Sequence, residues 1–380
     1  MPLDRLYLQD RAVQASDDST FIVQLPRTGV ISALGLGVRI TNGATAGEEV
    51  IEDALDRIEV LANGSVPLYS VTGRVLYALN ALWLRRRPPR LRTEAASAVQ
   101  ESWYLIPFGY YLGDREHALD LGRYASVELR VRYSPTIAAT AFATGTTTFS
   151  VLAYYFDPAR GGAAPSGHVR AVEVSAWTTA ASGEQQVLIP NEFDLLGLLL
   201  YQREVATAFD TNIVRVRLLE RIGGREFFNR RAADLASENH EELGLSAIER
   251  GIALRADAGL LNTDVNYLED IDVSPVFDVS DANGTVFTNP RSIAGDQVNI
   301  AVNQLADAAA DTHVTLSTTR RTIRWVAVGR GLPHAVYIPL SYWGVWGSAY
   351  PARQRDQLAL MVEQGGAGGD ARVIALQAAA

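Results

Sequence analysis

The sequence predicts an all-β protein that contains two similar sandwich domains in tandem. Many short segments alternate between apolar and polar residues, which is typical of strands with one face in water. A pattern of strand, loop, strand and helix occurs twice along the chain. The length of 380 residues suits two domains of similar size, and the 48% of hydrophobic residues is enough to fill their cores.

The strands are predicted from alternation and from residue type. The segment from Tyr124 to Tyr133 alternates apolar residues with glutamate and arginine, and the segment from Ile213 to Leu218 repeats this pattern. Three further runs of β-branched and aromatic residues are bounded by Gly, Pro, Asn or Ser: 149–156, 169–177 and 323–328. Many short strands separated by turn residues favour sandwiches or barrels.

Two segments break the strand pattern and predict helices. The segment from Gly73 to Leu84 has apolar residues at helical spacing, and Thr72 can cap its first turn. The segment from Glu226 to Leu243 also has helical spacing, and Gly244 can end it.

These helices follow matching segments, which predicts a duplicated domain. In the first copy, residues 32–38 and 55–61 are strand-like and precede the helix; in the second copy, residues 194–200 and 213–219 do the same. We pair Leu34 with Leu196 and Ile58 with Val216, with a shorter loop in the second copy.

The domain organisation follows from this repeat. We predict an N-terminal arm (1–18), a first sandwich (19–157), a linker rich in Gly, Pro and Ala (158–167), a second sandwich (168–350) and a C-terminal tail (351–380). The glycine-rich run from Gly365 to Gly369 predicts that the tail is mobile until a neighbour binds it.

Two adjacent segments resemble a known family. Residues 106–114 (IPFGYYLGD) and 118–131 (ALDLGRYASVELRV) are similar to the double jelly-roll major capsid proteins of adenoviruses and of tailless icosahedral phages with an internal membrane. The resemblance implies two tandem eight-stranded jelly-roll sandwiches, each with a short helix inserted between strands. It also implies a compact version, since the long insertions and tower loops of larger members find little room in 380 residues.

The resemblance further implies a structural viral major capsid protein and not an enzyme. Its homotrimer would form pseudo-hexagonal capsomers that tile an icosahedral shell. The expected partners are other copies of the chain, minor capsid or vertex proteins and an internal membrane surface. The expected location is the virion, after assembly in the host cytoplasm.

Composition narrows the function further. The net charge of -9 disfavours direct, sequence-specific binding of nucleic acid, because an acidic surface repels phosphate. All basic residues are arginines, and the absence of cysteine fits assembly in a reducing cytoplasm. No stretch approaches the 18 uninterrupted apolar residues of a membrane span, so we expect a soluble protein.

The sequence predicts no catalytic or cofactor-binding residue. Its five histidines are scattered, and there is no nucleophile elbow or phosphate-binding loop. Gly35 and Gly37 lack the third glycine of a dinucleotide-binding motif and indicate close packing of backbones. Asp278, Asp281 and Asn283 offer oxygen ligands for calcium, although a turn between strands is the simpler interpretation.

An aromatic segment near residue 345 gives the candidate interaction residues Tyr342, Trp343, Trp346 and Tyr350. The segment is interpreted as a docking patch for a neighbouring subunit, as the closing strand of the second core, or as a carbohydrate platform. The last interpretation gives the alternative function, a two-domain carbohydrate-binding or carbohydrate-acting β-sandwich protein. A metal-dependent double-barrel enzyme is disfavoured by the scattered histidines.

Overall fold

The computed structural model describes most of the chain. The described residues are 3–43, 50–85, 88, 90–91, 97–137, 142–157, 164–204, 209–220, 224–244, 246–254, 259–261, 278–280, 286–288, 299–303, 313–318, 322–355 and 357–379. In this part of the chain, no helix has both the length and the apolar composition that a membrane crossing requires.

The first jelly roll consists of two facing antiparallel sheets. One sheet has the order β1-β10-β3-β7-β6, and β8 adds to β3. Its strands are β1 (Asp4–Val13), β3 (Val30–Thr41), β6 (Arg90–Leu91), β7 (Val99–Pro107), β8 (Leu119–Asp120) and β10 (Thr148–Phe156). The other sheet has the order β2-β9-β4-β5. Its strands are β2 (Ser19–Gln24), β4 (Arg57–Ala62), β5 (Val66–Val71) and β9 (Val127–Tyr133).

The second jelly roll repeats the eight main strands of this topology in the same order, without counterparts of the two-residue strands β6 and β8. Its sheets have the orders β11-β25-β13-β23 and β12-β24-β14-β15. The first contains β11 (His168–Thr178), β13 (Asp194–Arg203), β23 (Ala335–Pro339) and β25 (Asp370–Ala379). The second contains β12 (Gly183–Ile189), β14 (Ile213–Glu220), β15 (Arg225–Arg231) and β24 (Leu358–Gln364). The predicted all-β class with two tandem eight-stranded jelly rolls is therefore confirmed.

A helix follows the fifth strand of each jelly roll, and the sequence predicted both helices. α1 (Gly73–Leu84) has the predicted bounds, and the Thr72 hydroxyl accepts a hydrogen bond from the N–H of Val75. α3 (Ala232–Leu243) ends at Gly244 as predicted but starts later than Glu226, because residues 225–231 form β15. The short elements η1 (Ile51–Ala54), η2 (Leu121–Arg123), α2 (Phe209–Asn212), η4 (Trp346–Ser348) and η5 (Ala352–Gln354) lie in connections.

A buried asparagine attaches each helix to a strand in the same way. The side-chain amide of Asn80 donates to the carbonyl of Leu105 and accepts from its N–H, both at 2.7 Å. Asn239 makes the same pair of hydrogen bonds to Tyr337, at 2.8 and 2.7 Å. Asn80 and Asn239 are each the eighth residue of their helix, which supports the predicted duplication at the level of side chains.

The predicted residue pairings are half right. Ile58 and Val216 occupy corresponding places in β4 and β14, each within its own core. The pairing of Leu34 with Leu196 is wrong, because a bulge between Leu195 and Gly197 shifts the strand. Leu198, and not Leu196, points into the second core.

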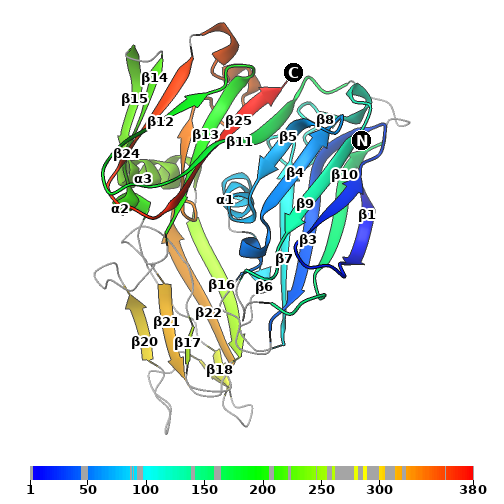
Figure 1. The fold of residues 1–380 in the computed structure, drawn as a ribbon, viewed down its shortest axis with the longest axis vertical. Helices are drawn as coiled ribbons and strands as arrows, with labels where there is room; N and C mark the ends of the chain where they lie inside the picture. Colours follow the sequence, from blue (N-terminus) through cyan, green and yellow to red (C-terminus); the bar gives the residue numbers. More distant parts are fainter. Residues whose placement is uncertain are drawn as a thin grey trace.

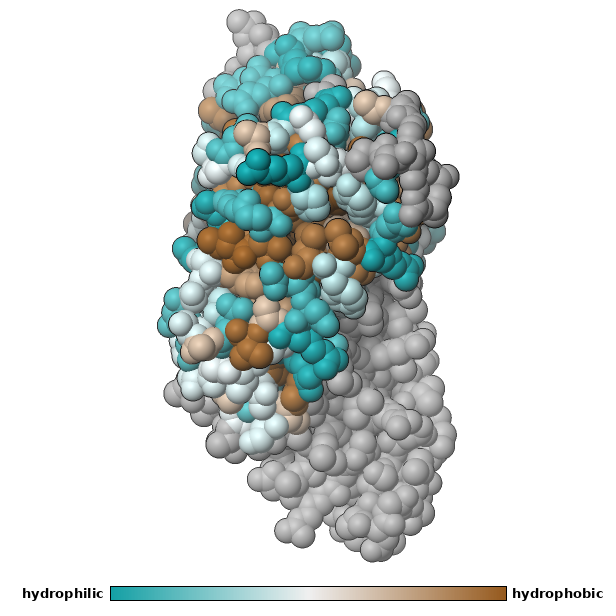
Figure 2. Space-filling view, turned by 90° about the vertical axis from the view of Figure 1, so that its right-hand side faces the viewer, coloured by the Kyte–Doolittle hydropathy of each residue, from teal (hydrophilic) through white to brown (hydrophobic). Residues whose placement is uncertain are grey.

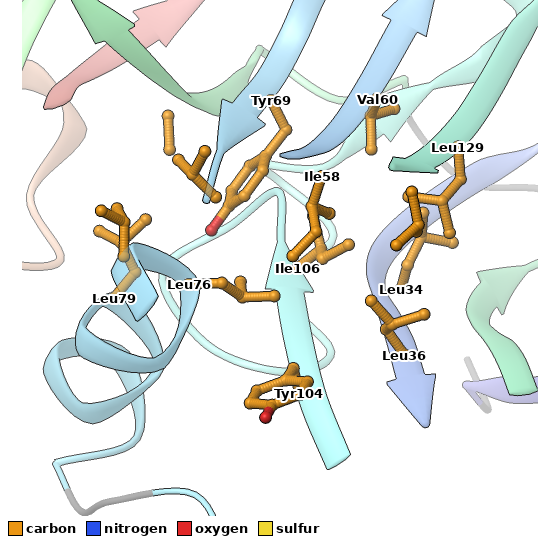
Figure 3. Close-up of a cluster of buried hydrophobic side chains, with 14 of the residues drawn as sticks. Leu34, Leu36, Ile58, Val60, Tyr69, Leu76, Leu79, Tyr104, Ile106 and Leu129 are labelled. Carbon is orange, nitrogen blue, oxygen red and sulfur yellow. The ribbon is translucent and has the colours of Figure 1, made fainter. Parts of the chain in front are cut away.

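The core of the first jelly roll lies between its two sheets and α1 (Figure 3). Leu34 and Leu36 of β3 face Ile58 and Val60 of β4, and Leu76 of α1 points toward Ile58. These side chains are almost completely buried.

The two jelly rolls are joined through a shared sheet. β5 pairs in parallel with β11 at Tyr69–Ala171 and Ser70–Val172, which gives the order β2-β9-β4-β5-β11-β25-β13-β23. α1 lies in the middle of the molecule, between the two halves (Figure 1), and contacts β13. Apolar residues of the second half, including Leu199 and Leu376, belong to the core cluster of the first half. A buried apolar junction of this kind fixes the relative position of the two domains.

The ends of the chain differ from the predictions. β1 pairs with β10, so most of the predicted arm is an edge strand of the first jelly roll. The prediction of a mobile tail after residue 350 is wrong, because β24 and β25 are inner strands of the second jelly roll. The glycine run at 365–369 connects these two strands. Residues 158–163 of the predicted linker lie outside the described residues.

An insertion between α3 and β23 also differs from the expected compact form. It extends away from the jelly rolls, at the bottom of Figure 1. One of its sheets has the order β16-β22-β18-β19 and the other has the order β17-β21-β20. The strands are β16 (Ser246–Leu254), β17 (Gly259–Leu261), β18 (Asp278–Ser280), β19 (Val286–Thr288), β20 (Asn299–Asn303), β21 (His313–Thr318) and β22 (Thr322–Arg330).

Candidate assembly surfaces

The loop that follows β7 is held rigidly by Asp114. This carboxylate is buried and accepts hydrogen bonds from the N–H groups of Tyr110 (3.1 Å) and His117 (3.0 Å). A side chain at Gly109 would collide with the carbonyl of His117, so the tight turn requires glycine there. The loop buries Tyr110 and leaves Tyr111 66% exposed.

The aromatic segment of the second jelly roll packs on this loop. The ring of Trp346 stacks on His117 at 4.6 Å, and Trp343 lies 6.1 Å from Tyr110 and 5.5 Å from Trp83 in edge-on geometry. The guanidinium of Arg85 lies 4.5 Å from the centre of the Trp343 ring. Trp343 and Trp346 therefore join the two jelly rolls of one chain.

The other two candidate residues, Tyr342 and Tyr350, lie nearby but do not contact the first jelly roll in the same way. Tyr342 is 80% exposed. Tyr350 stacks on Phe227 at 5.6 Å and exchanges two backbone hydrogen bonds with Leu195. The interpretation as a closing strand is wrong for residues 341–350, because β23 ends at Pro339 and turns follow it.

An open aromatic groove of about 670 Å³ lies on the second jelly roll beside these residues. Its walls come from β15, the end of α3 and the segment after β23. They consist of Phe227, Glu242, Leu243, Tyr337, Pro339, Leu340, Ser341, Tyr342, Trp343, Ser348 and Tyr350. The groove can accept an aromatic or aliphatic side chain from a partner.

The outer face of the sheet β1-β10-β3-β7 is apolar. Figure 2, which views the molecule from the β1 side, shows a hydrophobic band across this face. The apolar cluster on it contains Ala33, Leu152 and Tyr154, against which Leu3, Trp103 and Leu105 pack. Ala33, Leu152 and Tyr154 are only 1%, 7% and 9% exposed, so the accessible apolar part of this face comes from the partly exposed Leu3, Trp103 and Leu105.

Gly35 and Gly37 have a different role from the predicted one. A Cβ atom at Gly35 would lie 2.6 Å from Cζ2 of Trp103, and one at Gly37 would lie 2.6 Å from its Cζ3. The two glycines therefore make room for the indole on the outer face and do not bring backbones together.

A charged cavity of about 730 Å³ lies at the junction of the two jelly rolls. Glu173 of β11 pairs with Arg57 of β4 and with Arg372 of β25, both at 2.9 Å. Asp53 accepts two hydrogen bonds from Arg74, at 2.6 and 2.7 Å, and lies 3.8 Å from Arg203. Two of these ion pairs, Arg57–Glu173 and Asp53–Arg203, cross from one jelly roll to the other and add specificity to the apolar junction.

A buried histidine begins the second jelly roll. His168 is 4% exposed, and its burial, together with Arg170 and Arg123, lowers its pKa to about 4. Arg170 donates to the carbonyl of Pro67 at 2.7 Å and to Gln377 at 3.0 Å. The junction therefore contains a histidine that is neutral near pH 7.

The calcium prediction stays untested. Asp281 and Asn283 lie outside the described residues, and the backbone of Asp278 lies in β18. Among the described residues, no group of three or more His, Cys, Asp or Glu side chains is arranged to hold a metal ion.

Comparisons with solved structures match the whole chain. The major capsid protein P2 from bacteriophage PM2 gives a TM-score of 0.52 at 11% sequence identity, over 99% of this chain and 98% of that chain. The chain has a double jelly-roll fold. The double jelly roll of the STIV major capsid protein (from Sulfolobus Turreted Icosahedral Virus) gives a TM-score of 0.51 at 13% identity, over 88% of this chain and 98% of that chain. The PBCV-1 virus capsid gives 0.50 at 11% identity, over 99% of this chain and 94% of that chain.

These likenesses confirm the predicted resemblance for the double jelly-roll fold. At such low identity they carry no residue-level function to this chain. No protein-family model matches the sequence, and no curated protein is similar enough in sequence to match.

Sequence reasoning missed the counterpart of the aromatic segment in the first half. Tyr111 lies within the stretch that carries the family resemblance, but the exposure of its ring follows from the fold of the loop. One local signal was available. β7 and β23 both end in Ile-Pro, at 106–107 and 338–339, which aligns the loops that follow.

Proposed function

We propose that this protein is a viral major capsid protein and has no catalytic activity. The observation that carries the proposal is the tandem repetition of one jelly-roll topology, which matches the P2 capsid protein of PM2 along almost its full length. Two equivalent domains in one rigid chain suit a protein that tiles a surface.

In this proposal three chains form a homotrimer whose six jelly rolls make a pseudo-hexagonal capsomer. Capsomers then tile an icosahedral shell in the virion, after assembly in the host cytoplasm. The side chains of Leu6 and Tyr7 on β1 and the aromatic groove supply apolar surface that the single chain leaves exposed. Minor capsid or vertex proteins and an internal membrane surface are the further partners that we propose, and calcium is a possible bridging ion.

Mass photometry and negative-stain microscopy of the purified protein test this proposal. We expect trimers with a hexagonal outline. A protein that stays monomeric at micromolar concentration and above would contradict it.

A carbohydrate-binding function is the second candidate, because the groove contains aromatic side chains. Tyr342 is the most exposed of them and is the side chain that a sugar ring would contact. Binding on a glycan array that disappears in Tyr342→Ala would favour this function, and absence of binding to any glycan would remove it.

A further inference from the structure

Tyr111 and Trp343 occupy equivalent positions in the two jelly rolls. Each is the fourth residue after the Ile-Pro pair that ends its strand, at Pro107 and at Pro339. The loops also start alike. The N–H of Phe108 donates to a carbonyl of β3 at 2.9 Å, and the N–H of Leu340 donates to a carbonyl of β13 at 3.2 Å.

Trp343 fills a groove on the first jelly roll of its own chain. That groove lies between the end of α1, at Trp83 and Arg85, and Tyr110 of the loop after β7. The corresponding groove on the second jelly roll lies between the end of α3, at Glu242 and Leu243, and the loop after β23. The second groove is open, with about 670 Å³ of space.

The side chain equivalent to Trp343 is Tyr111 of the first jelly roll, and it is exposed. Tyr111 is 66% exposed and its neighbour Leu112 is 43% exposed. Trp343 thus contacts the first jelly roll of its own chain, whereas the equivalent side chain of Tyr111 is exposed and the groove on the second jelly roll is open. A contact between the Tyr111 loop of one copy and the groove of the next copy would use both surfaces. Such a contact joins two different surfaces, and its repetition can close a ring of copies.

We propose that the loop around Tyr111 of one copy docks in the aromatic groove of the next copy. The contact between copies then repeats the contact between the two jelly rolls of one chain. This inference rests on the proposed trimer and names its interface. The partner at the groove is a second copy of this chain.

The sheet edges support the same arrangement. Within the chain, β5 pairs in parallel with β11. Their counterparts by topology are β15 and β1, and both of these lie at an edge of their sheets in the described part of the chain. In the proposed contact, β15 of one copy meets β1 of the next.

The sheet faces also correspond. The face of β11-β25-β13-β23 that points away from the second core carries Leu199, Ile374 and Leu376, which are buried against the first jelly roll. Its counterpart is the outer face of β1-β10-β3-β7, where the partly exposed Trp103 and Leu105 pack against the cluster of Ala33, Leu152 and Tyr154. The proposed contact covers this face with the second jelly roll of the neighbouring copy.

Both surfaces carry charged side chains. α3 exposes Glu241 and Glu242 near its end. The outer face of the first jelly roll presents Arg5, whose guanidinium lies 5.8 Å from the ring of Tyr154. α1, which is buried within the chain, has Leu82 and Trp83 at the positions that correspond to the two glutamates. The difference suits a contact between copies that forms from soluble chains.

Thiol cross-linking tests the inference directly, because the natural chain contains no cysteine. The double variant Tyr111→Cys, Tyr342→Cys is treated with a short bismaleimide and separated on a denaturing gel. We expect covalent trimers from the double variant, and only covalent dimers from a mixture of the two single variants. The control pair Ile22→Cys, Tyr342→Cys places the first thiol on β2, at a side chain that is 52% exposed, and should give monomers.

Mass photometry of the same samples distinguishes failure of the proposed trimer from failure of the proposed contact within it. Trimers that do not cross-link through the 111–342 pair, or that cross-link equally through the control pair, overturn the inference and leave the trimer intact. A monomeric wild-type protein overturns the proposed function and the inference together.

A charged substitution provides an independent check. Tyr111→Asp should raise the dissociation constant of the trimer by at least about tenfold, because it places a negative charge in an aromatic groove beside Glu242. Ile22→Asp should leave the trimer unchanged, and circular dichroism should show both variants folded. Wild-type trimer stability in folded Tyr111→Asp would overturn the inference.

Discussion

Replacing Asn80 by alanine tests how the inserted helix is attached. Asn80 is 1% exposed and forms two hydrogen bonds of 2.7 Å with the backbone of Leu105. The substitution leaves one N–H and one C=O of Leu105 without these partners inside the first jelly roll. Each buried unpaired group costs about 1–3 kcal/mol, so we expect the free energy of unfolding to fall by about 2–6 kcal/mol.

Two measurements check this value. Denaturant unfolding reports the loss of stability, and hydrogen exchange of the peptide that contains Leu105 reports where the loss occurs. Exchange at Leu105 should accelerate by at least about tenfold, since about 1.4 kcal/mol corresponds to a factor of ten. Asn239→Ala should behave alike in the second jelly roll, and Asn191→Ala, on an exposed turn, is the control. A loss below about 0.5 kcal/mol with unchanged exchange would refute the reasoning.

Three further predictions concern the junction and the second jelly roll. The pKa of His168 is lowered to about 4 by burial and by two nearby arginines. Since the unfolded chain titrates near pH 6.5, this residue should make stability fall by about 1.4 kcal/mol per unit as the pH drops from about 6.5 toward 4. His168→Gln should flatten that slope in denaturant titrations at several pH values, and an unchanged slope would contradict the assignment. Gly197→Ala should destabilise the folded protein by about 1–3 kcal/mol, because the added methyl group would collide with the buried ring of Tyr337. Gly347→Ala is the control and should leave the thermal melt unchanged, because the space around Gly347 is open. Glu173→Gln should lower the free energy of unfolding by about 1–2 kcal/mol, because it weakens two ion pairs of 2.9 Å. Equal free energies of unfolding for the variant and the wild type at low salt would argue against this role.

Local signals in the sequence predicted the elements that depend on local interactions. α1 has its predicted bounds because Thr72 caps it and its apolar residues keep helical spacing. β9 was predicted because it alternates buried and partly exposed residues from Val127 to Tyr133. The start of α3 was predicted too early, because β15 is short and polar and gains its strand conformation by pairing with β14.

Features that depend on distant pairing escaped the sequence analysis. β25 looks like a tail because a glycine run precedes it, yet His168 pairs with Ala379 across most of the second half of the chain. Trp343 and Trp346 were predicted as candidates for contact with a neighbouring subunit, whereas their contacts with the loop after β7 of the same chain could be identified only once the two halves were placed together. The same holds for Tyr111, whose exposure depends on the anchoring of its loop by Asp114.

The central position of β24 and β25 determines the order in which the chain can fold during synthesis. β25 separates β11 from β13, and β24 separates β12 from β14, so neither sheet of the second jelly roll can close before residues 358–379 leave the ribosome. The first jelly roll, in contrast, has all its strands once residue 156 has emerged. A nascent chain therefore carries a finished first half and an open second half for most of its synthesis. Translation that stops before β24 therefore leaves a product without a closed second half.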